Sequence, residues 1–503
     1  MPRLASLLNH LVVVVLLAAP CARAARATHP AGHIESKTVT IGTPDGEKLE
    51  AELGTFYVRE NRQDPKSRVI GIGFARFKGE ATGAPPTFHL PGGPANSYLR
   101  NLNINKEGAA RVMPAAYAAD IALYRKISDV VYFDQRGYSE LGDVLMYSFQ
   151  TKDYPLDEPN SLQRERDEFI DVAQGAMAEF KAKGVDLTGY TVHECAADVN
   201  ELRKALGYDK VILIGQSFGC QWSFATMRLY PQIVARAVLS GIEPLDLGYD
   251  MPSHVYASLR RQWYAAEKDP AMKPYLPPGG IAGAVREIIK RLENAPLKVP
   301  VKDPKSNETV IITLGRDDFR PGEPANILAI YHGHYDEWAR AALNRRRAHK
   351  SNVAIIGPLI DTALAVTPLR RYLLRTDAAA DVLGLWNFDD YMATEELWPT
   401  ADVGDDFRTE VQNTTPVLFV QGDWDPNTPM ENLVHVMPHF VNGRAIIVHH
   451  GEHGAYARVR RTLPGATAAI MEYIRTGSTV NLPSAVTVPP REFKAPTFPL
   501  PAR

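Results

Sequence analysis

A serine between two glycines is the residue in this sequence best placed to act as a nucleophile. Gly215-Gln216-Ser217-Phe218-Gly219 has the G-x-S-x-G form of a nucleophile elbow. The apolar run Val211–Ile214 precedes it, and a segment compatible with a helix, Phe218–Leu229, follows it. A sharp turn from strand to helix lifts the serine hydroxyl out of a sheet, and only glycine leaves room at the flanking positions. We therefore predict that Ser217 is a nucleophile.

A catalytic serine needs a base, and the base needs a carboxylate that orients it. In this arrangement the acid lies between the serine and the histidine in the chain. The strand-like segment Pro416–Val420 is followed by QGDWDPNTP at 421–429, which contains two acids, Asp423 and Asp425. Asp425 lies farther out in the loop, where it can reach across to a histidine. We predict Asp425 as the orienting acid and keep Asp423 as the alternative.

The histidine follows the next strand-like segment, Arg444–Val448. His453 lies in a glycine-flanked loop, which suits an imidazole placed between a carboxylate and a serine. His449 and His450 stand at the strand end instead. The three histidines together are a conceivable zinc site, but no other residues in the chain have the spacing of metal ligands. We predict His453 as the base and no metal.

Two further loops are expected near this site. PGGP at 91–94 follows the strand-like segment Thr87–Leu90, and its glycines let the backbone approach a substrate. That loop is a candidate for the second N–H donor that an oxyanion needs, with a plain turn as the alternative. DQRG at 134–137 follows another strand-like segment. There we expect Asp134 and Arg136 to form a buried pair that braces the loops, without a catalytic role.

The elements that must position these residues alternate between strands and helices. Alternation of this kind predicts a mostly parallel sheet with helices on both faces. The expected strands are Lys37–Ile41, Leu49–Val58, Val69–Phe77, Thr87–Leu90, Asp129–Phe133, Val211–Ile214, Ala235–Leu239, Pro416–Val420 and Arg444–Val448. The expected helices are Leu162–Lys183, Cys195–Leu206, Phe218–Leu229, Gly283–Leu292, Ile327–Arg346 and Thr467–Ile474.

The alternation of strands and helices stops between the expected strands Ala235–Leu239 and Pro416–Val420. Residues 244–406 are mostly helical and often interrupted by Pro and Gly, which predicts a helical cap inserted into the core. We therefore expect a core in two parts, 35–243 and 407–480, and a Pro-rich extended tail at 481–503 that lies on the surface.

Composition narrows the class of protein. The 56 Lys and Arg against 58 Asp and Glu give a net charge of −2, so no overall basic field attracts nucleic acid or an anionic membrane. Residues 1–24 have a basic start, an apolar run and a small-x-small end, which predict a cleaved secretory signal and an exported protein, periplasmic or secreted. The three cysteines exclude a disulfide scaffold. Cys195 and Cys220 remain after cleavage, either paired or as separate buried thiols.

The motifs together resemble a known group. PGGP, DQRG, GQSFG, the GDWDPNTP segment at 422–429 and the HG at 453–454 occur in the order found in the proline iminopeptidase/tripeptidyl aminopeptidase family. That family consists of serine peptidases with the α/β-hydrolase fold. The PGGP form and the D-P-x-T-P pattern are more similar to its exported tripeptidyl aminopeptidase branch. The loops depart from the family at Ala95, where glycine is usual, and after DQRG.

The resemblance implies roles for individual residues. Ser217, Asp425 and His453 would form the triad, and the backbone N–H groups of Gly93 and Phe218 would form the oxyanion hole. The family removes residues from the free N-terminus of short peptides and needs no cofactor. Acidic residues help it to bind the substrate's ammonium group. Glu243 is one candidate, and Asp336 and Glu337 are others; a solvated or salt-bridged acid is the alternative for each.

Two rival functions share this scaffold. An esterase or lipase uses the same catalytic residues and differs only in the cap and the acyl pocket. A non-catalytic binding protein on the same fold usually lacks a triad member, whereas all three are present here. We therefore expect a serine aminopeptidase acting on short peptides, with an esterase as the first alternative and a binding protein as the second.

Overall fold

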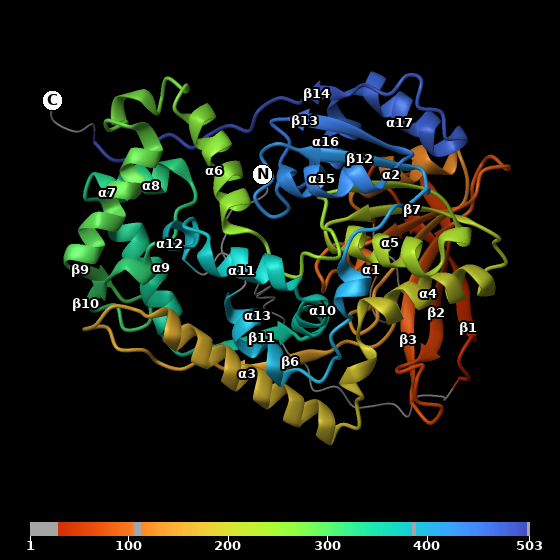
Figure 1. Ribbon diagram of the computed structural model, residues 1–503, viewed down its shortest axis with the longest axis horizontal. Helices are drawn as coiled ribbons and strands as arrows, with labels where there is room; N and C mark the ends of the chain where they lie inside the picture. Colours follow the sequence, from red (N-terminus) through yellow and green to blue (C-terminus); the bar gives the residue numbers. More distant parts are fainter. Residues whose placement is uncertain (1–28, 105–111, 385–388, 500–503) are drawn as a thin grey trace.

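A computed structural model describes residues 29–104, 112–384 and 389–499, drawn as a ribbon in Figure 1. The segment predicted to be a signal peptide, 1–24, lies outside the described residues. The ribbon has two parts: a core built on a large sheet, and a mainly helical part beside it. The residues predicted to carry chemistry come from the core.

The sheet of the core is the frame of the molecule. Its order is β1-β2-β3-β5-β4-β7-β8-β12-β13-β14. The pairs β1/β2, β2/β3 and β3/β5 are antiparallel, and every pair from β5/β4 to β13/β14 is parallel. The strands are β1 (Ile34–Gly42), β2 (Lys48–Arg59), β3 (Val69–Phe77), β4 (Thr87–Leu90), β5 (Val130–Phe133), β7 (Val211–Gln216), β8 (Val234–Ser240), β12 (Val417–Gly422), β13 (Gly443–His449) and β14 (Ala485–Thr487). The predicted fold class is confirmed.

The central strands are mainly apolar because both faces of the sheet are covered. In β5, Val131 and Phe133 belong to one hydrophobic cluster, and Val130 and Tyr132 to the other. The helices that cover the two faces are α1 (Tyr98–Asn101), α2 (Ala115–Arg125), α4 (Val192–Ala205), α5 (Phe218–Leu229), α15 (Met430–Val436), α16 (Ala455–Thr462) and α17 (Pro464–Thr476). The first cluster continues beyond the strand ends into the segment between β8 and β12, with Ile356 and Leu359 among its members.

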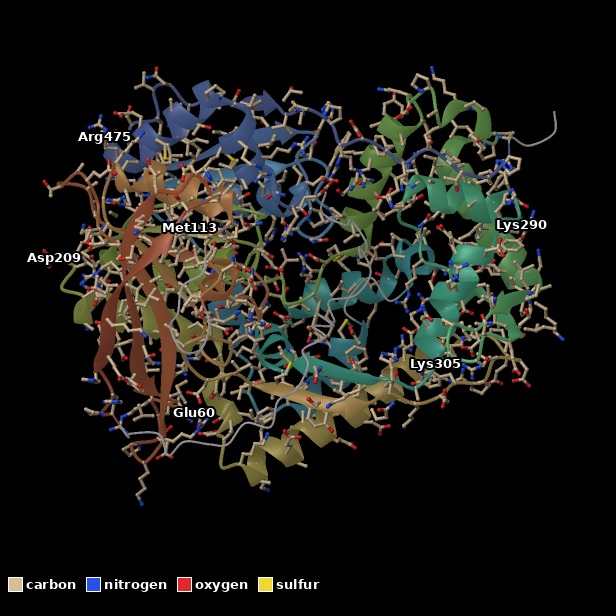
Figure 2. The ribbon with its side chains drawn as sticks, turned by 180° about the vertical axis from the view of Figure 1, so that it is seen from behind. Glu60, Met113, Asp209, Lys290, Lys305 and Arg475 are labelled. Carbon is tan, nitrogen blue, oxygen red and sulfur yellow. The ribbon has the colours of Figure 1, made fainter. Side chains whose placement is uncertain are left out.

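The segment between β8 and β12 forms the second part, which we call the cap. Its helices are α6 (Pro252–Ala266), α7 (Gly280–Asn294), α8 (Pro324–Tyr331), α9 (Asp336–Arg346), α10 (Ile356–Leu364), α11 (Pro368–Thr376), α12 (Ala380–Leu383), α13 (Asp389–Thr394) and α14 (Asp405–Arg408). Figure 2 shows the cap from behind, with Lys290 and Lys305 on it and Asp209 and Arg475 on the core. Short 3₁₀ turns lie at Leu187–Gly189, Pro231–Ile233, Lys273–Tyr275, Arg316–Asp318, Glu395–Leu397 and Met437–His439.

The cap differs from its sequence prediction in two places. The helix predicted at Ile327–Arg346 is two helices, α8 and α9, because the chain turns at Gly333 with a positive φ of 86°. The cap is also less purely helical than expected. It contains the hairpin of β9 (Leu297–Lys302) and β10 (Thr309–Leu314), on which α9 packs.

Two elements from earlier in the chain lie against the cap. Strand β6 (Met146–Gln150) pairs with β11 (Lys350–Ala354), and helix α3 (Leu162–Ala182) packs against α13. Figure 1 shows α3 along the lower edge of the molecule, beneath α13 and β11. Residues 146–182, which the sequence analysis grouped with the core, therefore help to build the cap side of the structure.

The C-terminal segment crosses from the core to the cap (Figure 1). After β14, Phe493 packs on Trp424 with ring centroids 5.9 Å apart. Farther on, Phe498 stacks on His334 of the cap with ring centroids 4.5 Å apart. The hydroxyl of Tyr275 donates a hydrogen bond to the carbonyl oxygen of Phe498 at 3.1 Å. The tail predicted to lie on the surface thus contacts both parts.

The two cysteines that follow the predicted signal are not bonded to each other. Cys195 and Cys220 are both buried free thiols, and burial raises the pKa of each. Cys220 Sγ contacts the carbonyl oxygen of Ser240 at 3.3 Å.

None of the described helices is long and apolar enough to cross a membrane.

Candidate active site

Ser217 stands at the turn between β7 and α5. Its backbone has φ 56° and ψ −128°, a conformation that residues other than glycine rarely adopt. The residue is 9% exposed. Both flanking glycines are required by space. A Cβ at Gly215 would lie 2.4 Å from the carbonyl oxygen of Gly219, and one at Gly219 would lie 2.3 Å from that of Leu90. The sequence therefore folds into a tight strand-to-helix turn with the serine at its tip.

The structure brings Asp425 and His453 together. Nδ1 of His453 lies 2.9 Å from Oδ2 and 3.2 Å from Oδ1 of Asp425, which is 1% exposed. The carboxylate is also held by the hydroxyl of Thr428 at 2.6 Å and by the N–H groups of Asn427 and Thr428 at 2.9 and 3.1 Å. Because a carboxylate only accepts, Nδ1 of His453 carries the proton and Nε2 is left as an acceptor.

The competing acid and histidines have a separate arrangement. Asp423 lies 2.9 Å from Nδ1 of His449 and accepts a hydrogen bond from the backbone N–H of His450 at 2.8 Å. These contacts join the end of β12 to the end of β13. The ring of His450 points elsewhere, toward the carbonyl oxygen of Val488 at 3.1 Å. Asp423 therefore braces two strand ends, and Asp425 is the acid in contact with His453.

His453 and Ser217 lie on either side of the end of β8. The N–H of Ser217 donates to the carbonyl oxygen of Ser240 at 3.0 Å. A Cβ on the next residue, Gly241, would lie 3.1 Å from Cε1 of His453. In addition, Nε2 of Gln216 donates to the carbonyl oxygen of His453 at 3.1 Å. The base is thus fixed against the residues that carry the nucleophile.

The electrostatics of His453 suit a base. Burial alone lowers the pKa of its imidazole, but the charge and hydrogen bond of Asp425 outweigh burial, with a further contribution from Asp250. The pKa of His453 therefore ends above its ordinary value of 6.5. Its side chain is 28% exposed, so the ring remains accessible to a substrate.

The PGGP loop lies against the nucleophile. A Cβ at Gly92 would come within 3.0 Å of Cβ of Ser217 and 3.1 Å of the carbonyl oxygen of Gln216. The next residue, Gly93, has a φ of 116°, which favours glycine. Phe218 is the first residue of α5, a position whose N–H has no acceptor within the helix. The loop, at Gly92, and the start of the helix therefore both border Ser217.

A group of acids, in which Asp250 and Asp361 are buried and Glu243 is half-buried, lies next to the triad. Glu243, Asp250 and Asp361, which we call the acid cluster, act electrostatically on one another, and Asp425 adds to the effect on Glu243 and Asp250. Burial raises the pKa of Glu243 and Asp361 well above the ordinary range and that of Asp250 to about 7. Oε2 of Glu243 is buried and has no hydrogen-bond partner.

The comparisons with known proteins agree with this geometry. A family model described as the alpha/beta hydrolase fold matches residues 90–276, and one described as TAP-like protein matches residues 386–484. The first range contains the nucleophile elbow and the second contains the acid and the base. The chain is an α/β-hydrolase with a TAP-like C-terminal part.

Solved structures that resemble this hydrolase have low sequence identity. An esterase from Exiguobacterium antarcticum has 13% identity and a TM-score of 0.34, with 88% of this chain and 100% of that chain covered. An epoxide hydrolase from Mycobacterium thermoresistibile has 12% identity and a TM-score of 0.32, with coverage of 88% and 99%. An alpha/beta hydrolase fold protein from Chitinophaga pinensis has 11% identity and a TM-score of 0.35, with coverage of 84% and 98%. Scores this low do not relate the activities. No curated protein sequence matches the hydrolase.

The cap of the hydrolase holds the loop that carries the acid. From α6, Arg261 donates to the carbonyl oxygen of Asp423 at 2.5 Å and pairs with Glu431 at 2.8 Å. Its neighbour Gln262 donates to the carbonyl oxygen of Trp424 at 2.8 Å. The backbone on the N-terminal side of Asp425 is therefore fixed by a helix that lies outside the core.

The DQRG segment braces the fold differently from the expected pair. Arg136 is fully buried and binds Asp198 through Nε and Nη2, at 2.7 and 2.6 Å. Asp134 instead accepts hydrogen bonds from the hydroxyls of Ser97 and Ser139 at 2.8 and 3.1 Å. The expected pairing of Asp134 with Arg136 was wrong, because each has a better-placed partner on another element.

Of the acids that lie near the site, only Glu243 was predicted from the sequence as a substrate-binding residue. Glu243 lies in the acid cluster, whereas Asp336 and Glu337 are exposed on α9, which packs on the β9–β10 hairpin. Asp250 and Asp361 were missed because they belong to no motif and come from the start of the cap and from α10. Among the described residues, no group of three or more His, Cys, Asp or Glu side chains is placed to hold a metal ion.

A further pocket lies in the wall of the cap. Pro358 of α10 and Tyr391 of α13 belong to its mainly apolar lining. Asp361 lies one helical turn beyond Pro358 and acts on the pKa of Tyr391.

Proposed function

We propose that this hydrolase is an exported serine aminopeptidase that removes residues from the free N-terminus of short peptides. The acid cluster is the main support. A buried carboxyl group without a partner, such as that of Glu243, is costly unless a ligand completes it. A peptide's α-ammonium group, with a pKa of about 7.7–8.0, is a cation of suitable size. The TAP-like match over the region of the acid and base supports the same class.

The proposed reaction uses the triad for acyl transfer. Ser217 Oγ attacks the carbonyl carbon of the scissile bond while Nε2 of His453 accepts its proton. The oxyanion that forms accepts hydrogen bonds from the N–H of Phe218 and from the PGGP loop at Gly93. His453 then protonates the leaving amine, which leaves an acyl-enzyme on Ser217. Water, deprotonated by His453, attacks the acyl-enzyme and releases the N-terminal fragment.

The acid cluster would fix which bond is cut. An ammonium group bound near Asp425 places the substrate's N-terminus at one fixed distance from Ser217, so the enzyme would count residues from the free end. An ester substrate has no such group and gains nothing from the cluster. The proposal therefore separates an aminopeptidase from an esterase by the need for a free amine.

The first experiment compares the purified protein with Ser217→Ala. Substrates are aminoacyl and tripeptidyl anilides with free N-termini, the same anilides with blocked N-termini, and short-chain nitrophenyl esters. Cleavage of the free anilides alone, lost in Ser217→Ala, supports the aminopeptidase, and the preferred length identifies its branch. Ester cleavage without anilide cleavage would leave a capped esterase. Activity that survives in Ser217→Ala would remove Ser217 from the mechanism.

A matched pair of variants tests the amine site. Glu243→Gln removes the buried carboxylate, and Glu337→Gln removes an exposed one on α9 as the control. A charged hydrogen bond contributes about 1.5–3 kcal/mol, so KM for free anilides is expected to rise about 10- to 100-fold in Glu243→Gln alone. An equal rise with blocked anilides would show a general loss of structure instead. Export is tested by N-terminal sequencing of the protein recovered outside the cytoplasm, with a start at Ala25 expected.

A further inference from the structure

Arg370 in the first turn of α11 is held in place without an ionic partner. Its backbone N–H donates to the capping hydroxyl of Thr367 at 3.4 Å. Thr367 is fixed in turn by Asp246, which accepts from its N–H at 2.6 Å and from its hydroxyl at 3.0 Å. These contacts determine where the first turn of the helix begins. The direction in which the Arg370 side chain leaves α11 is therefore set by the fold.

The guanidinium group of Arg370 is buried and unpaired. The residue is 8% exposed, and neither Nε nor Nη2 has a hydrogen-bond partner. In the described ranges no carboxylate lies within ion-pair distance of it, whereas its neighbour Arg371 binds both oxygens of Glu395 at 2.8 and 2.6 Å. Burial lowers the pKa of Arg370 to about 10, which the charges of Asp246 and Asp250 do not offset. An unpaired buried cation of this kind is costly unless an anion joins it.

The unpaired arginine lies beside the acid cluster. The segment that carries Asp250 packs on α10 and α11: a Cβ at Gly248 would lie 2.5 Å from the carbonyl oxygen of Asp361, and Met251 shares a hydrophobic cluster with Leu374 of α11. The charge of Asp250 acts on both Arg370 and His453. Two more buried atoms near Asp250 have no hydrogen-bond partner, Nδ1 of His254 and Oδ1 of Asn432. The site thus places carboxyl oxygens without hydrogen-bond partners, on Glu243 and Asp250, near the unpaired guanidinium group of Arg370. A ligand that carries one positive and one negative group adds no net charge when it binds there.

We propose that Arg370 is a specificity-determining residue that binds a carboxylate on the side chain of the substrate's N-terminal residue. The inference rests on the proposed aminopeptidase function. When the α-ammonium group occupies the acid cluster, the group that reaches past Asp250 belongs to that same N-terminal residue. The planar guanidinium can bind a carboxylate through two parallel hydrogen bonds. The enzyme would therefore prefer peptides that begin with Glu or Asp.

The preference is measured as a ratio within one enzyme sample. Paired anilides begin with Glu or with Gln, as single residues and as tripeptides, and the ratio of their kcat/KM values is compared in four proteins. These are the wild type, Arg370→Gln, Arg370→Lys and Arg375→Gln, an exposed arginine on the same helix. If part of a sample is unfolded, both kcat/KM values fall by the same factor, so their ratio does not change. Loss of one partner of a buried charge pair predicts a Glu/Gln ratio on the order of 30-fold or more in the wild type.

The variants then assign the preference to Arg370. The ratio is expected to fall to near one in Arg370→Gln, to be partly kept in Arg370→Lys and to be unchanged in Arg375→Gln. Stronger inhibition of the wild type by free glutamate than by glutamine is expected as well, and that measurement needs no variant. A wild type that cleaves free anilides without a Glu preference, or a preference that survives in Arg370→Gln, would overturn the inference and leave the aminopeptidase standing. Failure to cleave any free anilide would overturn the proposed function instead.

Discussion

The side chain of Gln216 holds the main chain of His453. Its Nε2 donates to the carbonyl oxygen of His453 at 3.1 Å, although the two residues are far apart in the sequence. Gln216 is the last residue of β7 and the one before the nucleophile. The turn that presents Ser217 therefore also fixes the loop that presents the base. Ser217 and His453 are therefore positioned by one connected piece of structure.

The first prediction follows from that contact. Replacing Gln216 with Leu keeps the volume but removes the donor, so the His453 loop loses an anchor. A shift of about 1 Å in a catalytic group costs about 100-fold in rate, and we expect kcat to fall about 10- to 100-fold with little change in KM. Steady-state kinetics check this, with the exposed Gln163→Leu on α3 as the control. An unchanged kcat would show that the loop is held by other contacts.

The second prediction separates the two acids of the 421–429 loop. Asp425→Asn leaves His453 without an oriented, negatively charged partner, and loss of this carboxylate costs about 10⁴-fold in kcat in a well-studied triad. The side-chain carboxylate of Asp423 contacts the ring of His449 and the backbone N–H of His450, and no contact joins it to His453 among the described residues. We therefore expect Asp423→Asn to lower kcat less than about 10-fold. The reverse order of effects would exchange the roles of the two acids.

The core was predictable because its sequence signals are local. The apolar strand Val69–Phe77 and the helix Phe218–Leu229 have the predicted bounds, since a fully buried strand and a helix after a nucleophile elbow leave patterns within a few residues. The same holds for the loops that carry Ser217, Asp425 and His453. Each follows directly from a strand end, and parallel strands bring those ends to one edge of the sheet.

The cap and the proposed ligand-binding residues were not predictable in the same way. The β9–β10 hairpin lies in a region of helical pattern, and its strand Leu297–Lys302 is interrupted by Pro300. Asp250, Asp361 and Arg370 lie in the segment before α6, in α10 and in α11, and each matters because of its burial and its neighbours. Burial and proximity across elements leave no mark at the residue itself, so sequence alone could not single them out.

The third prediction concerns pH. His453 acts as a base only when neutral, and its pKa lies above 6.5 because Asp425 outweighs burial. The rate at which a sulfonyl fluoride reagent modifies Ser217 should therefore fall on the acid side with a midpoint above pH 6.5. This probe has no amine, so titration of the acid cluster contributes less to the pH dependence of its reaction with Ser217. In Asp425→Asn only burial and Asp250 remain, and the midpoint should move to lower pH.

The same shift has a consequence for stability with a defined sign. A group whose pKa is raised by folding stabilises the folded state below its unfolded pKa, and that contribution is lost as pH rises through the folded value. The contribution of the His453–Asp425 pair is therefore fully present below pH 6.5 and is lost as pH rises through the pKa of His453 in the folded protein, which lies above 6.5. A wild-type midpoint of modification at or below pH 6.5 would contradict both statements.

The fourth prediction concerns the space between the PGGP loop and the nucleophile. Gly92→Ala places a methyl group 3.0 Å from Cβ of Ser217 and 3.1 Å from the carbonyl oxygen of Gln216. Ser217 or the loop must shift by a few tenths of an ångström, so we expect kcat to fall about 10-fold or more. Gly465→Ala on α17 is the control, because a Cβ there meets no atom within 4 Å. Equal activity in the two variants would place the loop farther from the reaction than its contact with Ser217 indicates.

The last prediction concerns the strain at the nucleophile. The φ of 56° and ψ of −128° at Ser217 cost an L-residue about 1–3 kcal/mol, a cost that glycine largely avoids. Ser217→Gly and Ser217→Ala both lack the hydroxyl, so neither should be active. They differ in backbone freedom, and Ser217→Gly should unfold at a temperature about 1–2 °C higher than Ser217→Ala. Calorimetry of the two inactive variants isolates the backbone effect, because the lost side-chain contacts are nearly the same. If Ser217→Ala proved equally stable, the elbow would have to relax once the hydroxyl is gone, which would make the hydroxyl's own contacts the source of the strained geometry.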